Sequence, residues 1–456
     1  VTLSHKYRDF DEKGMVAGGP MYYMKKRLNI SIKNGYRIKT GYWMGGFFAV
    51  ATVLSSFGSG SLPQINSISN SVFATFGIKH VITGAIMAFF LALIIIGGIK
   101  RIAKVTERLV PFMAIFYFVG ALAVILFNYQ NIIPSFASIF LDLFTGTAAT
   151  GGFLGAGFAF AFNQGVNRGL FSNESGQGSA PIAHAAAKAH EPVSEGMVAI
   201  LEPFIDTIII CFLTGLVLLS SGVWKEKLPN QFQKTDIEVL TAHYSENKPS
   251  DVSRLENHLN QTARLPLFSG KLDIKDGQLQ ENVSIIHARS LASEVVVLES
   301  GQPFTGRIDV VNGKVTTTPY NVTFRGNSLI HSAPLTTAAF SKSFFGDFGK
   351  YIVSIGLLLF AFSTSIAWSY YGDRAVTYLF GANYVLIYRI VFVIAFFFAS
   401  FTDTTIIWNV SLLTVAFMAI PNLFGLLVLH REVKSTIKGY WKGFRQEYPD
   451  ERTPEE

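Results

Sequence analysis

The chain has 456 residues, of which 50% are hydrophobic and only 15% are charged, against about a quarter charged in an ordinary soluble protein. This composition, with its 41 phenylalanines, fits surfaces that face lipid better than one large globular core. It excludes a disordered chain, and the single cysteine, Cys211, excludes a small secreted domain held by disulfides. The sequence therefore predicts a polytopic membrane protein.

A helix that crosses a bilayer needs about 20 mostly apolar residues. The sequence offers eight such segments, of which the first and the fourth are short and rich in glycine. They are Gly41–Phe57, Val81–Ile99, Val110–Phe127, Gly151–Gly165, Met197–Val223, Tyr351–Tyr370, Tyr384–Phe401 and Ile406–Leu429. We predict an all-α membrane bundle in two parts, residues 1–223 and 346–430, followed by a basic tail, residues 431–456.

Residues 224–345 have the composition of a soluble protein. Gly306–Val311 and Val315–Phe324 alternate apolar and polar residues, and the Asn312-Gly313 pair between them is typical of a hairpin turn. We expect this segment to be a soluble, β-rich insertion between the two parts of the bundle.

The net charge of +7 is explained by where the cations lie. Lysine and arginine concentrate before the first predicted span, in alternate loops and in the tail, whereas the intervening short loops hold almost none. Short loops rich in these residues stay in the cytoplasm. Both ends are then expected inside, and residues 224–345 outside, a cytoplasmic membrane of bacterial type. The basic excess indicates orientation in membrane lipid and not a nucleic-acid partner.

The glycine-rich stretch Thr145–Gly157 has two interpretations. Small residues allow close packing of membrane helices, which the spacing alone favours. Alternatively, a broken helix here frees backbone groups that bind substrate or ions near the membrane midplane. A second punctuated stretch, Phe57–Asn66, ends the first predicted span, and a simple loop is its stronger interpretation.

Ser363, Thr364 and Ser365 lie inside an apolar run that also contains Trp368. Hydroxyls at that depth often bond back to the preceding helical turn, but they also suit a sodium ion. Trp368 follows Thr364 by one helical turn, shares its face and could bound a ligand. The two interpretations are equally supported by the residues.

Glu202 and Asp206 are four residues apart within a predicted span, so they share a helix face. Carboxylates inside a bilayer are functional candidates by default, although they could instead satisfy a neighbouring broken helix. The sequence contains no hydrolase, zinc-protease or phosphate-loop motif. Its histidines, His5, His184 and His190 among them, have no ligand spacing, so no enzyme, cofactor or metal site is predicted.

Arg168–Ala187 (RGLFSNESGQGSAPIAHAAA) resembles the signature of the alanine or glycine:cation symporter family, and it differs clearly only at Ser175, where alanine is usual. Gly18–Tyr23, Trp368–Gly381 and Met418–Asn422 also resemble family segments. The resemblance covers every predicted membrane segment but not the insertion.

The resemblance implies the inverted-repeat fold of the neurotransmitter:sodium symporters, in which two five-helix halves hold substrate and sodium between broken helices. It assigns substrate binding to Gly60, Gln64, Asn66, Gly151, Gly152, Phe153, Thr364 and Trp368. It assigns sodium binding to Ser363 and Thr364, and an inner gate or structural signature to Arg168, Asn173 and Glu174.

Two departures from the family pattern stand out. Family members begin with an extra helix and a broken helix that carries a GxGN-type motif, and this motif is absent here. We therefore expect the sequence to be a fragment that lacks the first helices, and as such it could be inactive. In Trp408–Ala416, Leu412 stands where many relatives carry an acidic residue.

The predicted function is sodium-coupled symport of a small neutral amino acid, alanine or glycine, by alternating access. Sodium is the coupling ion, and no cofactor is expected. The alternative is a membrane amino-acid sensor or binding protein on a transporter scaffold, which the insertion and the missing broken helix favour. A channel is a weaker alternative, because no filter-like sequence is present.

Overall fold

The computed structural model of the chain describes residues 1–31, 37–145, 149–317 and 322–449. The chain divides into two compact units. The first comprises Val1–Phe118, Asn167–Phe212 and Ser354–Glu456, and the second comprises Val119–Val166 and Leu213–Val353. Helices α6 (Ile99–Phe127), α8 (Phe158–Ser172), α13 (Phe212–Ser221) and α16 (Gly349–Phe380) contribute residues to both.

The first unit is almost entirely helical. Besides parts of α6, α8 and α16, its helices are α1 (Thr2–Lys6), α2 (Pro20–Arg27), α3 (Thr40–Gly58), α4 (Leu62–Phe76), α5 (His80–Ile95), α9 (Glu174–Gln177), α10 (Ala180–His184), α11 (Pro192–Val198), α12 (Leu201–Pro203), a π-helix (Phe204–Cys211), α17 (Val385–Ala399) and α18 (Thr404–Glu447). Two short antiparallel pairs complete it, β1 (Asp9–Phe10) with β2 (Val16–Ala17) and β3 (Ile30–Ser31) with β4 (Arg37–Ile38).

Within the described ranges, six helical segments are long and apolar enough to cross a membrane. They are Thr40–Phe76, Arg101–Phe127, Pro192–Ser221, Gly346–Phe380, Ala382–Ala399 and Ile406–Glu447. A shorter apolar helix spans His80–Ile95. This arrangement confirms the prediction of a polytopic, largely helical membrane protein.

The predicted span Gly151–Gly165 is not among the candidate membrane spans of the described residues. Helix α8 begins only at Phe158 and continues to Ser172. Gly151 (φ +56°) and Gly155 (φ +83°) adopt left-handed backbone that a right-handed helix cannot include. The chain therefore turns here, and the helix starts after the glycines.

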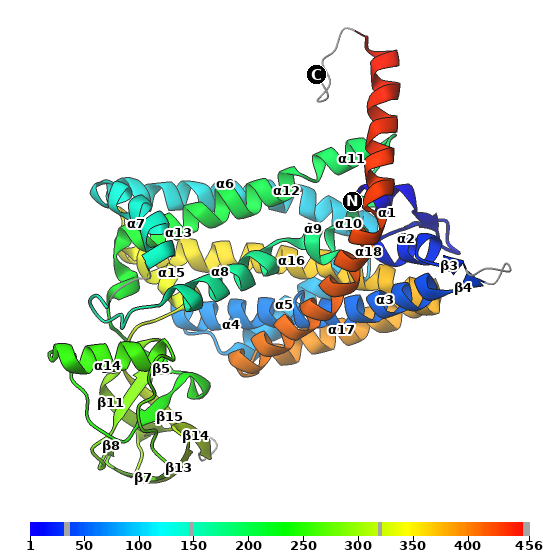
Figure 1. The fold of residues 1–456 in the computed structure, drawn as a ribbon. Coiled ribbons are helices and arrows are strands. Elements are labelled where there is room, and N and C mark those ends of the chain that lie inside the picture. Colours follow the sequence, from blue (N-terminus) through cyan, green and yellow to red (C-terminus); the bar gives the residue numbers. More distant parts are fainter. Residues whose placement is uncertain (32–36, 146–148, 318–321, 450–456) are drawn as a thin grey trace. The chain divides into compact units, whose positions relative to one another are not determined.

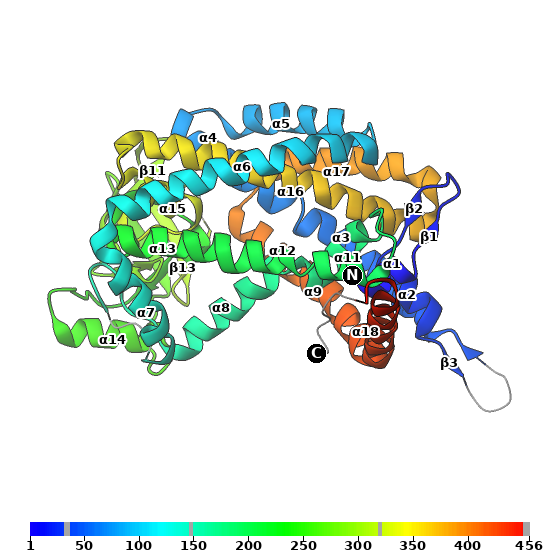
Figure 2. The same cartoon turned by 90° about the horizontal axis from the view of Figure 1, so that it is seen from above.

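Small residues let the helices of the first unit approach closely. Helix α3 packs against α2 and α18 (Figures 1 and 2). A Cβ atom on Gly41 would lie 2.1 Å from the carbonyl oxygen of Met24, and one on Gly45 would lie 2.7 Å from that of Met21. Only glycine allows the backbones of α2 and α3 to come this close.

The second unit contains helices α7 (Ile132–Thr145), α13 (Phe212–Ser221), α14 (Pro249–Leu259) and α15 (Ser332–Ser341). Its antiparallel strands form three sheets, with orders β12-β11-β15-β5, β14-β13-β7-β8 and β10-β9-β6. The strands are β5 (Leu228–Phe232), β6 (Glu238–Leu240), β7 (Gly270–Lys275), β8 (Gln278–Leu279), β9 (Ser284–His287), β10 (Ser290–Leu291), β11 (Ser293–Glu299), β12 (Gln302–Pro303), β13 (Gly306–Val311), β14 (Lys314–Thr317) and β15 (Val322–Ser328).

The alternation of apolar residues explains these strands. Ile308 and Val310 of β13 are buried in one core while their neighbours are exposed or half-buried. Asn312 (φ +48°) and Gly313 (φ +74°) form the expected left-handed turn. The strand expected at Val315–Phe324 is instead divided between β14 and β15, and residues 318–321 lie outside the described ranges.

Candidate functional site

A cavity of about 370 Å³ lies in the first unit, beside the segment that resembles the family signature. Its lining residues are Ser172, Glu174, Ala180, Ala183, His184, Glu202, Asp206 and Tyr371. Three are carboxylates, and across the described ranges none of them forms an ion pair with lysine or arginine. We call this site the acidic cavity. Unpaired carboxylates in a membrane protein are costly and mark functional sites.

Glu174 is half-buried and lies in the first turn of α9, outside the candidate spans. It accepts hydrogen bonds from the indole Nε1 of Trp368 (2.9 Å) and from the hydroxyl of Ser179 (3.2 Å). Burial, followed by the nearby charge of Glu202, raises the pKa of Glu174 to about 7. This carboxyl group therefore exchanges its proton near neutral pH.

Glu202 and Asp206 each accept a hydrogen bond from a serine of the signature segment. The donor to Glu202 is the Ser175 hydroxyl (2.6 Å), and the donor to Asp206 is the Ser172 hydroxyl. Helix α12 passes into the π-helix between the two carboxylates, and π-helical turns are frequent at functional sites. The two carboxylates thus accept hydrogen bonds from a neighbouring segment and also line the cavity, and their functional role stays a prediction.

Trp368 connects the acidic cavity to the interruption between α3 and α4. Its side chain is 2% exposed, and its ring stands edge-on to that of Tyr371 at 5.3 Å. A Cβ atom on Gly60 would lie 2.1 Å from the Cβ of Trp368, so only glycine fits there. The predicted residues Gly60, Trp368 and Glu174 therefore form one contiguous row.

The hydroxyls predicted to bind sodium bond back along α16. Thr364 donates to the carbonyl of Phe360 (3.0 Å), and Ser363 donates to the same carbonyl (2.8 Å). Ser363 Oγ also lies 3.4 Å from the sulfur of Met113. These bonds use the hydroxyl protons and leave the oxygens as acceptors, so a role as cation ligands stays a prediction.

Gln64 and Asn66 donate hydrogen bonds to backbone carbonyls. Gln64 donates to the carbonyl of Ser59 (3.1 Å), inside the α3–α4 interruption. Asn66 donates to the carbonyls of Ala399 (3.2 Å) and Thr402 (2.8 Å), at the end of α17. Neither residue lines the acidic cavity, and their predicted contact with substrate stays a prediction.

Gly151, Gly152 and Phe153 belong to the second unit. The backbone N–H of Gly152 donates to the carbonyl of Lys225 (2.7 Å), and the ring of Phe153 stands edge-on to Trp224 at 5.5 Å. The structure thus gives these residues partners at the end of α13.

Arg168 and Asn173 frame the signature segment. The guanidinium of the exposed Arg168 lies over the ring of Trp408 at 5.3 Å, at the start of α18. Asn173 caps α9, because its side-chain oxygen accepts from the backbone N–H of Gly176 (2.9 Å). This cap holds Glu174 in the first turn.

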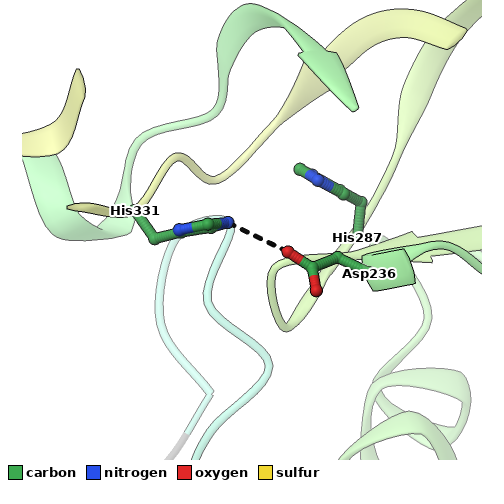
Figure 3. Close-up of side chains that lie close together, drawn as sticks. All are labelled: Asp236, His287 and His331. Carbon is green, nitrogen blue, oxygen red and sulfur yellow. Dashed lines mark hydrogen bonds and ion pairs between the residues drawn. The ribbon is translucent and has the colours of Figure 1, made fainter. Parts of the chain in front are cut away.

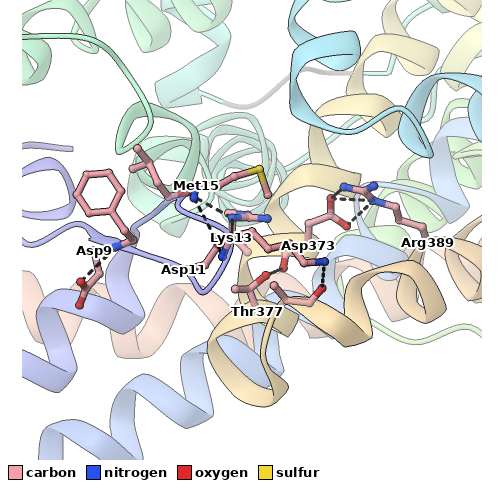
Figure 4. A network of polar contacts seen from close by, with 11 residues as sticks. Asp9, Asp11, Lys13, Met15, Asp373, Thr377 and Arg389 are labelled. Carbon is pink, nitrogen blue, oxygen red and sulfur yellow. Dashed lines mark hydrogen bonds and ion pairs between the residues drawn. The ribbon is translucent and has the colours of Figure 1, made fainter.

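Buried charges elsewhere in the first unit are paired (Figure 4). Arg374 and Asp11 are ion-paired at 3.0 Å, and each side chain is 2% exposed. Asp373 accepts from Arg389 Nε at 3.0 Å. We call these four residues the ionic network. Asp11 and Arg374 lie 363 positions apart in the sequence.

Sequence reasoning did not single out Tyr371 or Ser172 for the site. Tyr371 follows Trp368 by three residues, so the helical period could have placed it on the same side of α16. Ser172 has no such signal, because its partner Asp206 lies on a separate segment.

Comparisons with known proteins identify relatives across the chain. The model of the sodium:alanine symporter family matches residues 1–246 and 314–453. The sodium/alanine symporter AgcS of Methanococcus maripaludis is 33% identical over 440 residues, covering 96% of this chain and 73% of the relative. An uncharacterized transporter of Haemophilus influenzae is 30% identical, covering 98% and 74%.

A putative sodium/proton-dependent alanine carrier, YrbD of Bacillus subtilis, is 34% identical over 223 residues, covering 49% of this chain and 43% of the relative. The resemblance inferred from the signature segment is confirmed. The expectation that it leaves out all of residues 224–345 is wrong, because the family model also matches residues 224–246 and 314–345 and leaves out only 247–313 of this segment. This polypeptide belongs to the sodium:alanine symporter family, whose members are cation-coupled membrane transporters and not enzymes.

Proposed function

We propose that this protein couples an inward sodium gradient to the uptake of a small neutral amino acid, alanine or glycine, by alternating access. The observation that carries this proposal is the acidic cavity, whose carboxylates form no ion pair with lysine or arginine within the described ranges. A monovalent cation or the ammonium group of an amino acid would supply the missing positive charge. The names of two relatives, a sodium/alanine symporter and a putative alanine carrier, support the choice of ion and substrate.

Trp368 is the proposed link between ion and substrate. Its indole donates to Glu174 on one side, and its Cβ rests on the backbone of Gly60 on the other. A cation that neutralises Glu174 would alter the indole position and thereby the wall of the amino-acid site. Thr364, one turn before Trp368, would contribute its free lone pairs to sodium together with Ser363.

We infer an inverted-repeat fold of the neurotransmitter:sodium symporter type, with residues 224–345 outside the cytoplasmic membrane and the C-terminal tail inside. The interruption at 59–61 and the π-helix support it, because irregular backbone at membrane depth is tolerated only where it lines a cavity or is buried in protein. The orientation follows from the basic loops and tail.

A membrane sensor is the second candidate, because residues 247–313 fall outside the family model. Such an insertion could bind an amino acid without transport. Sodium-driven accumulation of substrate separates the two candidates, since a sensor would bind alanine but not concentrate it.

The test is uptake of radiolabelled alanine into proteoliposomes containing the purified protein, with an inward sodium gradient compared with choline at equal ionic strength. We expect accumulation with sodium only. Glu174→Gln should lower the apparent sodium affinity, whereas Glu191→Gln, a change at an exposed carboxylate just before α11, should not. Alanine binding without accumulation in either gradient would overturn the symporter in favour of the sensor.

A further inference from the structure

Three side chains far apart in the sequence meet in the second unit. Asp236 ends a 3₁₀ turn (Lys234–Asp236), His287 ends β9, and His331 directly precedes α15. One potential ligand atom from each residue lies within 4.8 Å of the other two. His331 Nε2 is 3.1 Å from Asp236 Oδ2, and Figure 3 shows the three side chains together. Their separation in sequence explains why no spacing motif reveals them.

His287 supplies the observation that points to a ligand. The residue is 2% exposed, and its Nε2 atom is buried without a hydrogen-bond partner. Its ring is held by stacking on Phe232, at 4.5 Å between centroids. A buried polar atom without a partner is costly and is rare in folded proteins.

The other ring nitrogen of His287 prepares Nε2 as a ligand. Nδ1 lies 2.8 Å from the hydroxyl of Ser328, and that hydroxyl donates to the carbonyl of Leu329 (3.2 Å). The hydroxyl therefore accepts from Nδ1–H, which leaves the lone pair on Nε2. A histidine that ligates a metal usually donates its other N–H in this way.

We propose that Asp236, His287 and His331 bind a divalent transition-metal ion, with Zn²⁺ the best match. Two imidazoles and one carboxylate form a nitrogen-rich set that suits zinc, whereas calcium and magnesium prefer oxygen ligands. Ligand atoms of a tetrahedral zinc site lie roughly 3.3 Å apart for bonds of about 2.0–2.1 Å. The atoms of His331 and Asp236 already have this separation, so closing the site needs a shift of about 1.5 Å at most.

A bound ion would join the segment before α15 to strand β9 and leave a fourth position for water. Lys314 is the nearby opposing charge, because its ammonium acts on Asp236 and donates to the carbonyl of Ile237 (3.3 Å). It lowers the affinity without occupying the site. The competing interpretation is that His331 and Asp236 form only a hydrogen-bonded pair and that His287 Nε2 binds no metal.

The test uses the full chain, purified in detergent with any histidine tag removed and stripped of metal by a chelator. Zn²⁺ is then titrated in competition with a chromophoric chelator. We expect one equivalent to bind tightly, and His331→Ala to weaken binding at least about tenfold. His331 is substantially exposed, so this variant should fold. His243→Ala, which changes an exposed histidine of the same unit, should bind as the unchanged protein does.

Co²⁺ provides a second readout that is independent of affinity. The unchanged protein and His243→Ala should give the intense visible bands of four-coordinate cobalt, and His331→Ala should lose them. Equal zinc binding and equal cobalt spectra in all three proteins would overturn the proposal, because the metal would then bind elsewhere. Absence of zinc binding in the unchanged protein would overturn it as well.

Discussion

The acidic cavity and the ionic network are both built from carboxylates in the first unit, but they are neutralised in opposite ways. In the ionic network Asp11 and Asp373 each have an arginine partner. In the acidic cavity the donors to Glu174, Glu202 and Asp206 are hydroxyls and an indole N–H. A neutral donor lowers the cost of a buried charge but does not balance it.

This difference separates a structural from a functional use of the same side chain. A paired carboxylate has no further need for a cation, so the ionic network can hold segments together without any ligand. An unpaired carboxylate becomes favourable when a cation arrives or when it takes up a proton. The acidic cavity is therefore the place where sodium, substrate ammonium or a proton would act.

The largest expected effect comes from breaking a pair in the ionic network. Arg374→Gln leaves the buried Asp11 without its cation, which should lower the free energy of unfolding by about 3–5 kcal/mol. Thermal unfolding in detergent measures the loss as a lower midpoint. The matched control is Arg431→Gln, at an exposed arginine of α18, whose midpoint should not change. An unchanged midpoint for Arg374→Gln would show that the pair is not needed for folding.

In the acidic cavity, removing a donor to a carboxylate should affect transport more than folding. Trp368→Phe keeps the ring in its buried place but removes the N–H that donates to Glu174. Losing one hydrogen bond to a charged group costs about 1.5–3 kcal/mol, so the sodium concentration for half-maximal uptake should rise about tenfold or more. Trp408→Phe is the control, because Trp408 contacts Arg168 instead. Equal sodium dependence in both variants would remove Trp368 from the coupling path.

The protonation of Glu174 should give the transporter a pH dependence. Because burial raises its pKa to about 7, the group is protonated below that pH and negatively charged above it. It is roughly one-tenth ionised at pH 6 and roughly nine-tenths at pH 8. The apparent sodium affinity should therefore rise by about tenfold from pH 6 to pH 8.

Uptake measured against sodium concentration at both pH values checks this expectation. Glu174→Gln should abolish the dependence, because glutamine does not titrate, whereas Glu191→Gln should retain it. If the apparent sodium affinity of Glu174→Gln still changed with pH, the titration would belong to another group.

The contrast also shows what the sequence could reveal about the fold. Apolar runs placed most membrane helices, because their signal is local composition. The predicted span Gly151–Gly165 is not among the candidate membrane spans of the described residues, since glycine is apolar enough to extend a run yet adopts the left-handed backbone that ends a helix. The division of the strand expected at Val315–Phe324 was equally invisible to alternation alone.

For the site, the sequence predicted Trp368, Glu174 and Gly60, and it singled out Glu202 and Asp206 through the cost of carboxylates in a membrane; the structure brings the three carboxylates to one cavity. It could not pair Ser172 with Asp206 or Arg374 with Asp11, because each pair joins segments that only the folded chain brings together. Local patterns reveal which charged residues would be costly to bury, and the tertiary structure determines which partners compensate their charge.

The smallest expected effect comes from removing the hydroxyl that donates to Glu202 in the acidic cavity. Ser175, which stands where the family resemblance leads one to expect alanine, donates to Glu202 at 2.6 Å. Ser175→Ala removes this donor, but Glu202 still faces a cavity that can hold water, so the loss should be about 1 kcal/mol or less. The sodium concentration for half-maximal uptake should change about two- to fivefold. Ser194→Ala is the control, because the Ser194 hydroxyl donates instead to the backbone carbonyl of Glu191, and this variant should leave the sodium concentration for half-maximal uptake unchanged. A shift as large as that of Trp368→Phe would mean that Glu202, and not Glu174, carries the charge that attracts the cation.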